Sequence, residues 1–374
     1  GGSTVATTGK ETSSDGDTTD GDIYVNSDIT WSSQNVLTLT ADDEIHVNAK
    51  IENTNAVNGG VYFDAANDTN KVVFGANGKV IIHNIYQLQW MNTAKNGKYE
   101  LGSNIDAYYT NPNLANPAWN VGDHDNDGGT ADVAMGFDPI GSSYVTRFDG
   151  TFDGKGYSIA NLYINRPGIN NVGLFGYAGY NAEISNVTFN GADVTGYDNV
   201  GILIGQGSPT VTNVHVTGSV TGNNTVGGMF GSTGSDNTIT TVRSSATVNG
   251  VYAIGGLAGE IFAEGGTSTI SKAYATGDVT GQDAIGGMFG QVYFTTLTAD
   301  QLYARGNVSG RDAVGGLIGY VGDNLGLTNS YAWGDVTASG NFAGGLIGTV
   351  DGNGKIIAID NSYSSGAVSA SNNA

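Results

Sequence analysis

Cysteine is absent from the 374 residues, which excludes disulfides, thiolate metal sites and cysteine catalysis. Basic residues are few: 14 Lys and Arg stand against 35 Asp and Glu, for a formal net charge of -21. Because this charge repels phosphate groups, we expect neither nucleic acid nor an anionic membrane surface as a partner. No apolar run approaches the roughly 18 residues of a membrane-spanning helix, so we expect no membrane insertion.

Proline is also scarce, with 5 residues, whereas glycine is abundant, with 60. The glycines follow no triplet period, which excludes collagen. Because 39% of the residues are hydrophobic, the chain can bury a sizeable core, and we expect the glycines to serve tight turns and close backbone approach. No signal peptide is visible, and the chain stops within its repeat pattern at Ala374, so we expect a fragment of a longer protein.

The first half of the chain divides into three segments. Residues 1–20 are mostly Ser, Thr, Gly and Asp, which predicts a disordered tail or linker. Residues 21–82 carry short apolar runs at roughly ten-residue spacing, which predict an all-β sandwich, barrel or β-helix. Within 83–168, the sequence predicts one helix at 86–95, whose apolar face is Leu88, Trp90 and Met91, and a polar insertion loop at 106–134.

Residues 169–374 repeat. Seven motifs of the type Gly-Gly-Leu-Ile-Gly end at Gly176, Gly205, Gly231, Gly259, Gly290, Gly319 and Gly348, at steps of 29, 26, 28, 31, 29 and 29 residues. A second motif begins at Ile184, Val211, Ile239, Ile270, Leu327 and Ile359, and a third begins at Ala192, Gly218, Gly277, Gly306 and Gly334. Three β segments in about 29 residues predict one turn of a parallel β-helix.

The repeat also predicts how each turn packs. A strand without side chains at the doubled glycine lets a neighbouring layer or turn come close. The Leu, Met, Ile and Phe residues that follow the glycines are then expected to fill the core. Because both parities of the motif are apolar, the pattern does not decide which face of each strand points inward.

These repeats resemble the GLUG motif of large bacterial exoproteins. The segment 148–167, Phe-Asp-Gly-Thr-Phe-Asp-Gly-Lys-Gly-Tyr and onward, is similar to the lead-in that precedes GLUG arrays, and the block that begins at Gly21 resembles passenger coils of filamentous-haemagglutinin-like adhesins. The resemblance implies a right-handed parallel β-helix (solenoid), export through an outer-membrane transporter of the two-partner type, and attachment to a host-cell or surface glycan or protein receptor. It places the chain outside the cell, secreted or at the bacterial surface.

One acidic stretch is a candidate calcium site. Asp123, Asp125 and Asp127 alternate ahead of a glycine, as at the start of a calcium-binding loop. The bidentate acid expected at the twelfth position is missing, because Ala134 stands there. A plain acidic loop is the alternative, and calcium is the one cofactor that the sequence suggests.

Four Asn-x-Ser/Thr sequons are candidate glycosylation sites, at Asn67, Asn186, Asn223 and Asn307. A chain this rich in Asn, Ser and Thr also produces such sequons by chance.

Catalysis has little support in the sequence, and we expect no enzyme. The best cluster of carboxylates with basic partners is Arg147, Asp149, Asp153 and Lys155, which falls in the lead-in segment, where a structural role is the simpler interpretation. The four histidines, His46, His83, His124 and His215, show no metal-ligand spacing.

Tyrosine recurs once per turn, at Tyr274, Tyr303, Tyr331 and Tyr363. A stacked ladder is the simplest interpretation, and a sugar-binding strip is the alternative. We therefore favour a structural shaft and display segment of a secreted adhesin. The alternatives are a glycan- or protein-binding module, which acts through the insertion loop or an aromatic face, and a polysaccharide-active enzyme on the same fold.

Overall fold

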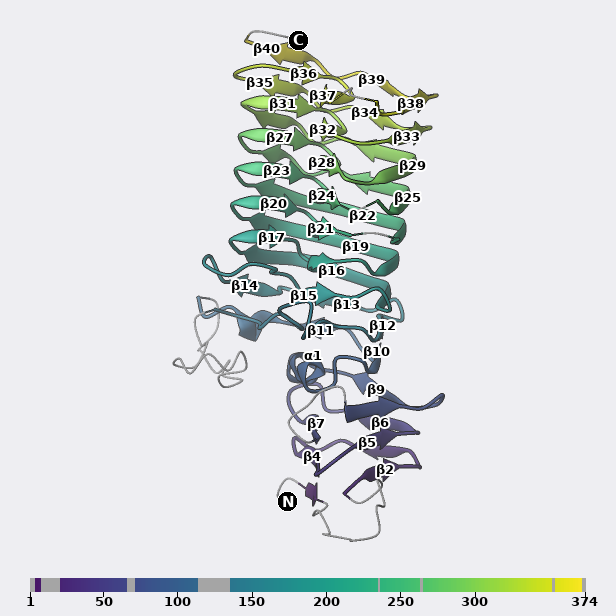
Figure 1. The fold of residues 1–374 in the computed structure, drawn as a ribbon. Coiled ribbons are helices and arrows are strands. Elements are labelled where there is room, and N and C mark those ends of the chain that lie inside the picture. The colour runs from purple at the N-terminus through teal and green to yellow at the C-terminus, as the bar shows by residue number, and fades with distance from the viewer. Residues whose placement is uncertain are drawn as a thin grey trace.

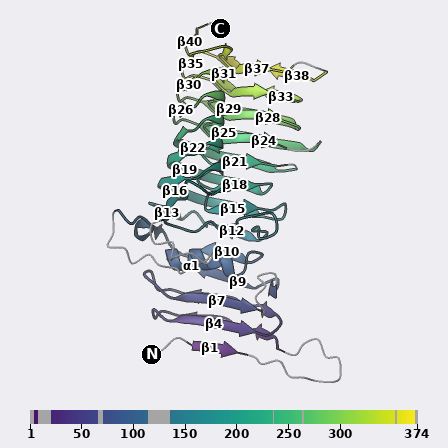
Figure 2. The same cartoon turned by 60° about the vertical axis from the view of Figure 1, so that its left-hand side comes forward.

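The chain forms a parallel β-solenoid of about ten turns, which confirms the fold class predicted from the repeats. The computed structural model describes residues 4–7, 21–65, 71–113, 135–234, 236–262, 265–351 and 354–371. The turns stack into an elongated tower with the N-terminus at one end and the C-terminus at the other (Figures 1 and 2). Of the predicted tail, residues 1–20, the structure describes only strand β1 (Thr4–Thr7).

Three sheets form the sides of the lower coils. Sheet A contains β1 (Thr4–Thr7), β4 (Val36–Ala41) and β7 (Gly60–Ala65), and sheet B contains β2 (Ile23–Val25), β5 (Ile45–Val47) and β8 (Val72–Phe74). Sheet C begins here with β3 (Ile29–Trp31), β6 (Lys50–Asn53) and β9 (Lys79–Ile82). Ile23 pairs in parallel with Ile45, and Ile29 with Ile51, so each strand meets its equivalent one turn later. Residues 21–82 are therefore β-helix coils.

Sheet C continues along the whole tower. Its next strands are β10 (Lys98–Leu101), β11 (Ile105–Asp106), β12 (Thr151–Asp153), β13 (Ser158–Ala160) and β14 (Tyr163–Asn165). The upper strands are β16 (Glu183–Thr195), β19 (Thr210–Thr221), β22 (Thr238–Asn249), β25 (Thr267–Ala275), β26 (Val279–Thr280), β29 (Thr296–Ala304), β30 (Val308–Gly310), β33 (Leu325–Thr328), β34 (Tyr331–Ala332), β35 (Val336–Ala338), β38 (Ile357–Asp360), β39 (Tyr363–Ser364) and β40 (Val368–Ala370). Pairings such as Tyr99 with Val80 and Thr151 with Glu183 carry the sheet across both segment boundaries expected from the sequence.

Two further sheets complete the upper coils. Sheet D contains β15 (Phe175–Ala178), β18 (Ile204–Gly207), β21 (Phe230–Thr233), β24 (Ala258–Phe262), β28 (Phe289–Tyr293), β32 (Ile318–Val321) and β37 (Ile347–Val350). Sheet E contains β17 (Asp198–Val200), β20 (Asn224–Gly227), β23 (Tyr252–Gly255), β27 (Asp283–Gly286), β31 (Asp312–Gly315) and β36 (Ala343–Gly344). The three motifs therefore do not map onto three strands. The second and third lie together on sheet C, whereas the glycine motif joins a strand of sheet E to one of sheet D.

The doubled glycines lie where successive turns touch, as the sequence predicts. A Cβ on Gly256 would lie 2.3 Å from the carbonyl oxygen of Gly287, one turn later. A Cβ on Gly287 would in turn lie 2.2 Å from the carbonyl oxygen of Gly316. Since real Cβ atoms essentially never come this close to another atom, only glycine fits. The apolar residues that follow are fully buried, as predicted for the core: Met229, Phe230, Leu257, Met288, Phe289 and Leu317.

The predicted helix exists but is shorter than 86–95. It consists of α1 (Ile85–Gln89) and a 3-10 turn, η2 (Trp90–Thr93). Asn84 caps α1 by accepting a hydrogen bond from the Gln87 backbone N–H, 3.0 Å away. Leu88 and Met91 are fully buried as expected, whereas Trp90 is only partly covered.

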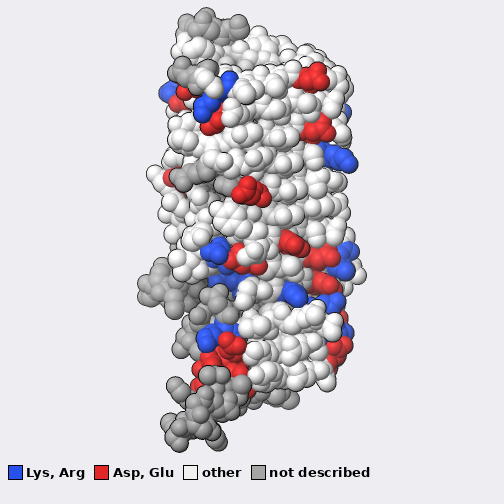
Figure 3. Space-filling model, turned by 45° about the vertical axis from the view of Figure 1, so that its right-hand side comes forward, with Lys and Arg blue, Asp and Glu red and all other residues white. Residues whose placement is uncertain are grey.

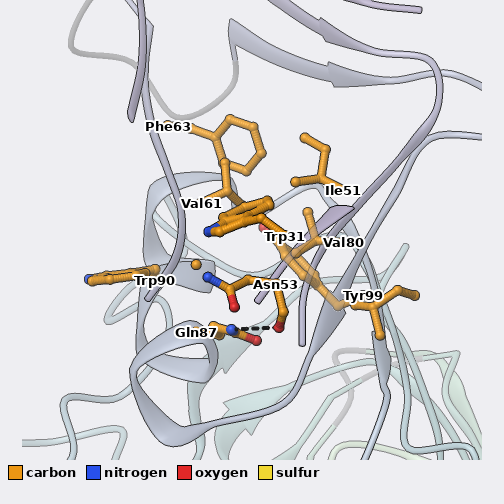
Figure 4. Close-up of a pocket in the computed structure, with 11 residues that line it drawn as sticks. Trp31, Ile51, Asn53, Val61, Phe63, Val80, Gln87, Trp90 and Tyr99 are labelled. Atoms are coloured by element: carbon orange, nitrogen blue, oxygen red, sulfur yellow. Dashed lines mark hydrogen bonds between the residues drawn. The ribbon is translucent and has the colours of Figure 1, made fainter. Parts of the chain in front are cut away.

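The helix packs onto the coil below it. Around a small crevice between the two lie Trp31, Asn53, Gln87 and Trp90, and the Gln87 side chain donates a hydrogen bond to the Asn53 carbonyl, 3.0 Å away (Figure 4). The predicted loop at 106–134 starts with a further 3-10 turn, η3 (Tyr108–Thr110), and its residues 114–134 lie outside the described part of the chain.

Candidate functional site

One column of outward-facing side chains runs up sheet C. Its members pair in register from turn to turn: Thr188, His215, Arg243, Tyr274, Tyr303, Tyr331 and Tyr363. We call these residues the outer column. Neighbouring strands are about 4.8 Å apart, so members one turn apart are in contact range. The column changes character along the tower, from small and basic residues to aromatic ones.

The tyrosines of the outer column form the ladder that the sequence predicts. Ring centroids are 4.8 Å apart between Tyr274 and Tyr303, 4.2 Å between Tyr303 and Tyr331, and 5.5 Å between Tyr331 and Tyr363. Burial, with neighbouring tyrosines, raises the pKa of the Tyr303 hydroxyl. Because the rings cover one another's faces, the inner rungs offer edges and hydroxyl groups to a ligand.

Beside the outer column, each strand bends at a residue with positive φ. These corner residues have φ between 47° and 57°: Asn186, Asn213, Thr241, Lys272, Gln301, Asn329 and Asn361. Non-glycine residues seldom adopt this conformation, but asparagine tolerates it best. The asparagines also form hydrogen bonds along the tower, as from Asn213 to Asn186 at 2.9 Å and from Asn329 to Asp300 at 2.8 Å. The third position of the second motif, often Asn, is the sequence signal for this corner.

The bend creates a hollow at the lower end of the tyrosine ladder. Its lining combines corner residues with members of the outer column: Gly156, Asn186, Val187, Thr188, Asn213, Val214, His215, Thr241, Val242, Arg243, Lys272, Tyr274 and Gln301. We call this the corner hollow. Its floor is made by small or branched side chains, and Arg243, Lys272 and Tyr274 are the large exposed groups around it.

Positive charge gathers in the corner hollow. Arg243 and Lys272 are exposed, and within the described residues neither forms an ion pair. Burial and the nearby charge of Arg243 lower the pKa of His215, so its imidazole is neutral at neutral pH. The Nε2 atom of His215 is buried and has no hydrogen-bond partner among the described side chains.

Asp300, a carboxylate beside the corner hollow, is already engaged. Hydrogen bonds from Asn329, Thr328 and Gln301, with the charge of Lys272, lower the pKa of Asp300. It therefore stays ionised and holds the corner residues together. The arrangement leaves Arg243 available to a ligand.

The lower coils carry a second, different cluster of charges, which lines another hollow on sheet C. Lys79 lies 3.0 Å from Glu100, and Lys155 lies 3.5 Å from Asp153 and 3.9 Å from Glu100. Figure 3 shows basic and acidic side chains intermixed over the lower coils, with fewer charges across the middle of the tower. Since opposite charges are matched here, the cluster is a structural network rather than a free anion or cation site.

The catalytic candidates separate into two ion pairs. Arg147 pairs with Asp149 at 2.6 Å, and Lys155 pairs with Asp153. Burial raises the pKa of Asp153, but hydrogen bonds from Asn186 and the Lys155 backbone outweigh it and lower the pKa overall. A carboxylate held ionised in this way is a poor general acid.

The calcium residues Asp123, Asp125 and Asp127, and the sequon residue Asn67, lie outside the described residues. Within the described part of the chain, no group of three or more His, Asp or Glu is arranged to hold a metal ion. The same residues contain no helix long and apolar enough to span a membrane.

The other sequon residues differ in their surroundings. The side-chain amide of Asn186 donates to Asp153 at 3.0 Å, and that of Asn223 donates to Asp198 at 3.2 Å. Asn307 is exposed, and its side-chain oxygen accepts from the backbone N–H of Asp335. A glycan on the side-chain nitrogen would break the contacts of the first two, so Asn307 is the best-placed acceptor of the three.

A partly buried carboxylate on sheet D has no counterpart among the predicted sites. Burial raises the pKa of Glu260, although hydrogen bonds from Gln291 and Ser232 act in the opposite direction. Gln291 also accepts a hydrogen bond from the Tyr252 hydroxyl, at 2.7 Å. Sequence reasoning missed this group because Glu260 directly follows a glycine motif and gives no separate signal.

No family model matches this chain. It is 39% identical over 160 residues to halomucin of Haloquadratum walsbyi, a match that covers 42% of this chain and 2% of halomucin. It is 35% identical over 89 residues to a "Putative Gly-rich membrane protein" of Evansella cellulosilytica, which covers 24% of this chain and 9% of that protein. The chain thus spans a small part of the curated relatives that it matches.

A solved structure shares the fold. It is described as a "putative immunoglobulin A1 protease" from Bacteroides ovatus, with a TM-score of 0.50 and 19% sequence identity. The match covers 78% of this chain and 77% of that one. At this identity the likeness concerns the fold alone.

Proposed function

We propose that this chain is a rigid shaft and display segment of a large secreted or surface-attached protein. The observation that carries the proposal is the continuity of sheet C from β3 to β40. A single sheet that passes through every segment couples each turn to the next, as in other solenoids.

The relatives support an extracellular location. One is named halomucin and the other a Gly-rich membrane protein, and in both the matched region is a small fraction of a much longer chain. A net charge of -21 also keeps a secreted chain soluble. Export by a two-partner transporter and attachment to a host or surface receptor belong to the same proposal, and they rest on the GLUG resemblance.

Small-angle scattering of the chain tests the shaft. We expect the profile of a rigid rod, with a length of at least roughly 50 Å for ten turns at the spacing of neighbouring strands. Amide exchange should show that the sheet C strands on both sides of the two segment boundaries, at 82/83 and 168/169, are protected to a similar degree. A compact globular profile, or rapid exchange of the segment 83–168 as a separate unit, would contradict the proposal.

Attachment is tested separately by binding of the fluorescently labelled chain to whole cells. Binding that depends on the chain favours a module that itself engages a receptor. No binding leaves the chain as a spacer that holds other modules away from the surface, which is the form of the proposal that we favour.

A further inference from the structure

The corner hollow has features that a spacer does not need. It lies at the junction of two kinds of side chain in the outer column, basic below and aromatic above. We propose that the corner hollow binds a carboxylated sugar residue of an acidic polysaccharide. The chain can bind such a ligand whether or not it serves as a shaft.

The charge of the site selects an anion. The chain has only 14 basic residues, and ion pairs engage many of them, including Lys79, Lys155 and Arg311. Arg243 and Lys272 are exceptions within the described residues, and both are exposed at the corner hollow. A guanidinium next to an ammonium group suits a carboxylate, which Arg243 can bind with two parallel hydrogen bonds.

The aromatic group of the site suits a sugar ring. Tyr303 packs against one side of the Tyr274 ring, with centroids 4.8 Å apart and planes tilted by 48°, and the opposite side of Tyr274 faces the turn of Arg243. Tyr274 is 41% exposed and lines the corner hollow, so part of its ring is accessible to the apolar face of a pyranose. Amide and hydroxyl groups of Asn213, Thr241 and Gln301 surround it and can bind sugar hydroxyl groups.

The backbone around the corner hollow argues against an acidic peptide. An extended peptide binds best by adding a strand to an open sheet edge. Here β19, β22 and β25 pair with one another in register on either side of the corner residues, so these strands present no open edge to such a peptide. The site therefore offers mainly side chains, which suits a carbohydrate.

A direct test is calorimetric titration of the chain with a galacturonic acid trisaccharide. Its methyl ester is the matched ligand, because the sugar rings stay and the charge is lost. We expect binding of the acid and at least about tenfold weaker binding of the ester, since one charge-assisted hydrogen bond is worth at least that factor. Equal binding of acid and ester, or no binding of the acid at millimolar concentration, would overturn the proposal.

Variants locate the site. The double variant Arg243→Gln with Lys272→Gln should weaken binding of the trisaccharide at least about tenfold. The control variant Arg311→Gln with Lys355→Gln removes the same charge elsewhere on the tower and should bind as the unaltered chain does. If both double variants lose binding equally, the net charge and not the corner hollow holds the ligand, and the proposal is wrong.

A second pair of variants tests the sugar-stacking surface. Tyr274→Ala should weaken binding of the trisaccharide, whereas Tyr363→Ala, at the far end of the same ladder, should not. Circular dichroism shows whether each variant keeps its fold, and Tyr274→Phe keeps the ring if Tyr274→Ala does not fold. Polyglutamate is the final comparison: binding as tight as that of the trisaccharide would assign the site to acidic peptides instead and overturn the proposal.

Discussion

The lower and upper coils share sheet C but are held together by different means. In residues 21–106, charged side chains link neighbouring turns, as in the pairs Lys71–Asp43 at 2.5 Å, Lys79–Glu100 at 3.0 Å and His83–Glu52 at 3.0 Å. In residues 183–371, doubled glycines bring the backbones of successive turns into contact, and a continuous column of Met, Leu and Phe fills the interior. In the lower coils such a contact occurs at single glycines, as at Gly78 against the Val47 carbonyl oxygen, whereas the regular repeat places it in turn after turn of the upper coils.

This comparison predicts that the upper coils tolerate no side chain at the glycine contacts. Gly287→Ala places a Cβ 2.2 Å from the Gly316 carbonyl oxygen, so the two turns must separate. We expect a loss of about 3 kcal/mol in the free energy of unfolding, measured by chemical denaturation. Gly168→Ala is the control, because a Cβ there meets nothing within 4 Å. Equal stability of the two variants would show that the turns do not depend on this contact.

In the lower coils, the largest single effect should come from a side-chain cap. Asn84 is buried, accepts from the Gln87 N–H and donates to the Asn55 carbonyl at 2.8 Å. Asn84→Ala should cost about 2 kcal/mol, since it removes the helix cap and leaves the partly buried Asn55 carbonyl without its donor. Amide exchange should accelerate around α1 and leave the coils above residue 183 unchanged. Acceleration throughout the tower would mean that the two regions unfold as one unit.

In the upper coils, pH should act through Glu260. Burial raises its pKa above the usual 4.5, so the folded chain holds this proton more tightly than the unfolded chain does. Stability is therefore lost as pH rises from about 4.5 through the raised pKa of the folded state. Glu260→Gln should raise Tm by about 2 °C at pH 7 and have no such effect at pH 4. A Tm that falls at pH 7 would mean that the carboxylate itself stabilises the fold.

The smallest effect should come from one charge pair of the lower coils. Glu100→Gln removes the partner of both Lys79 and Lys155, but these groups are partly exposed, so we expect a loss of less than about 1 kcal/mol. The loss should shrink further in 1 M salt, where the Debye length is about 3 Å. Denaturation at two salt concentrations measures it, and a loss that is independent of salt would assign the effect to packing.

Much of this fold could be predicted from the sequence because the same motifs recur in turn after turn. The glycine motifs predicted the turn length, the close backbone contact and the buried Leu, Met and Phe residues. The helix at 86–95 was predicted too long, because η2 tightens after Trp90 and ends at Thr93. Periodicity alone does not distinguish a short α-helix from one that continues as a 3-10 turn.

Only part of the candidate site could be predicted from the sequence. Tyr274 and the other rungs share a motif, so their column was predicted. His215 and Arg243 stand at the same fifth position of the second motif as Tyr274, and the strand register places all three in one column. The motif did not show that these residues line a hollow. The corner at Asn186 was missed because its positive φ lies inside what the pattern presents as one straight strand. Lys272, the corner residue two turns from Asn213, stands at the same third position of the second motif, but lysine itself does not indicate a corner as asparagine does.

The direction of the backbone hydrogen bonds has a mechanical consequence. They run along the tower, from one turn to the next, as the stacked strands in Figure 1 show. A pull on one end therefore peels the outermost strand from its single neighbour, whereas each inner turn is held from both sides. Under tension the chain would peel off turn by turn, with about 29 residues released at each step in the upper coils. A solenoid of this kind can lengthen under force while the turns that remain stay folded.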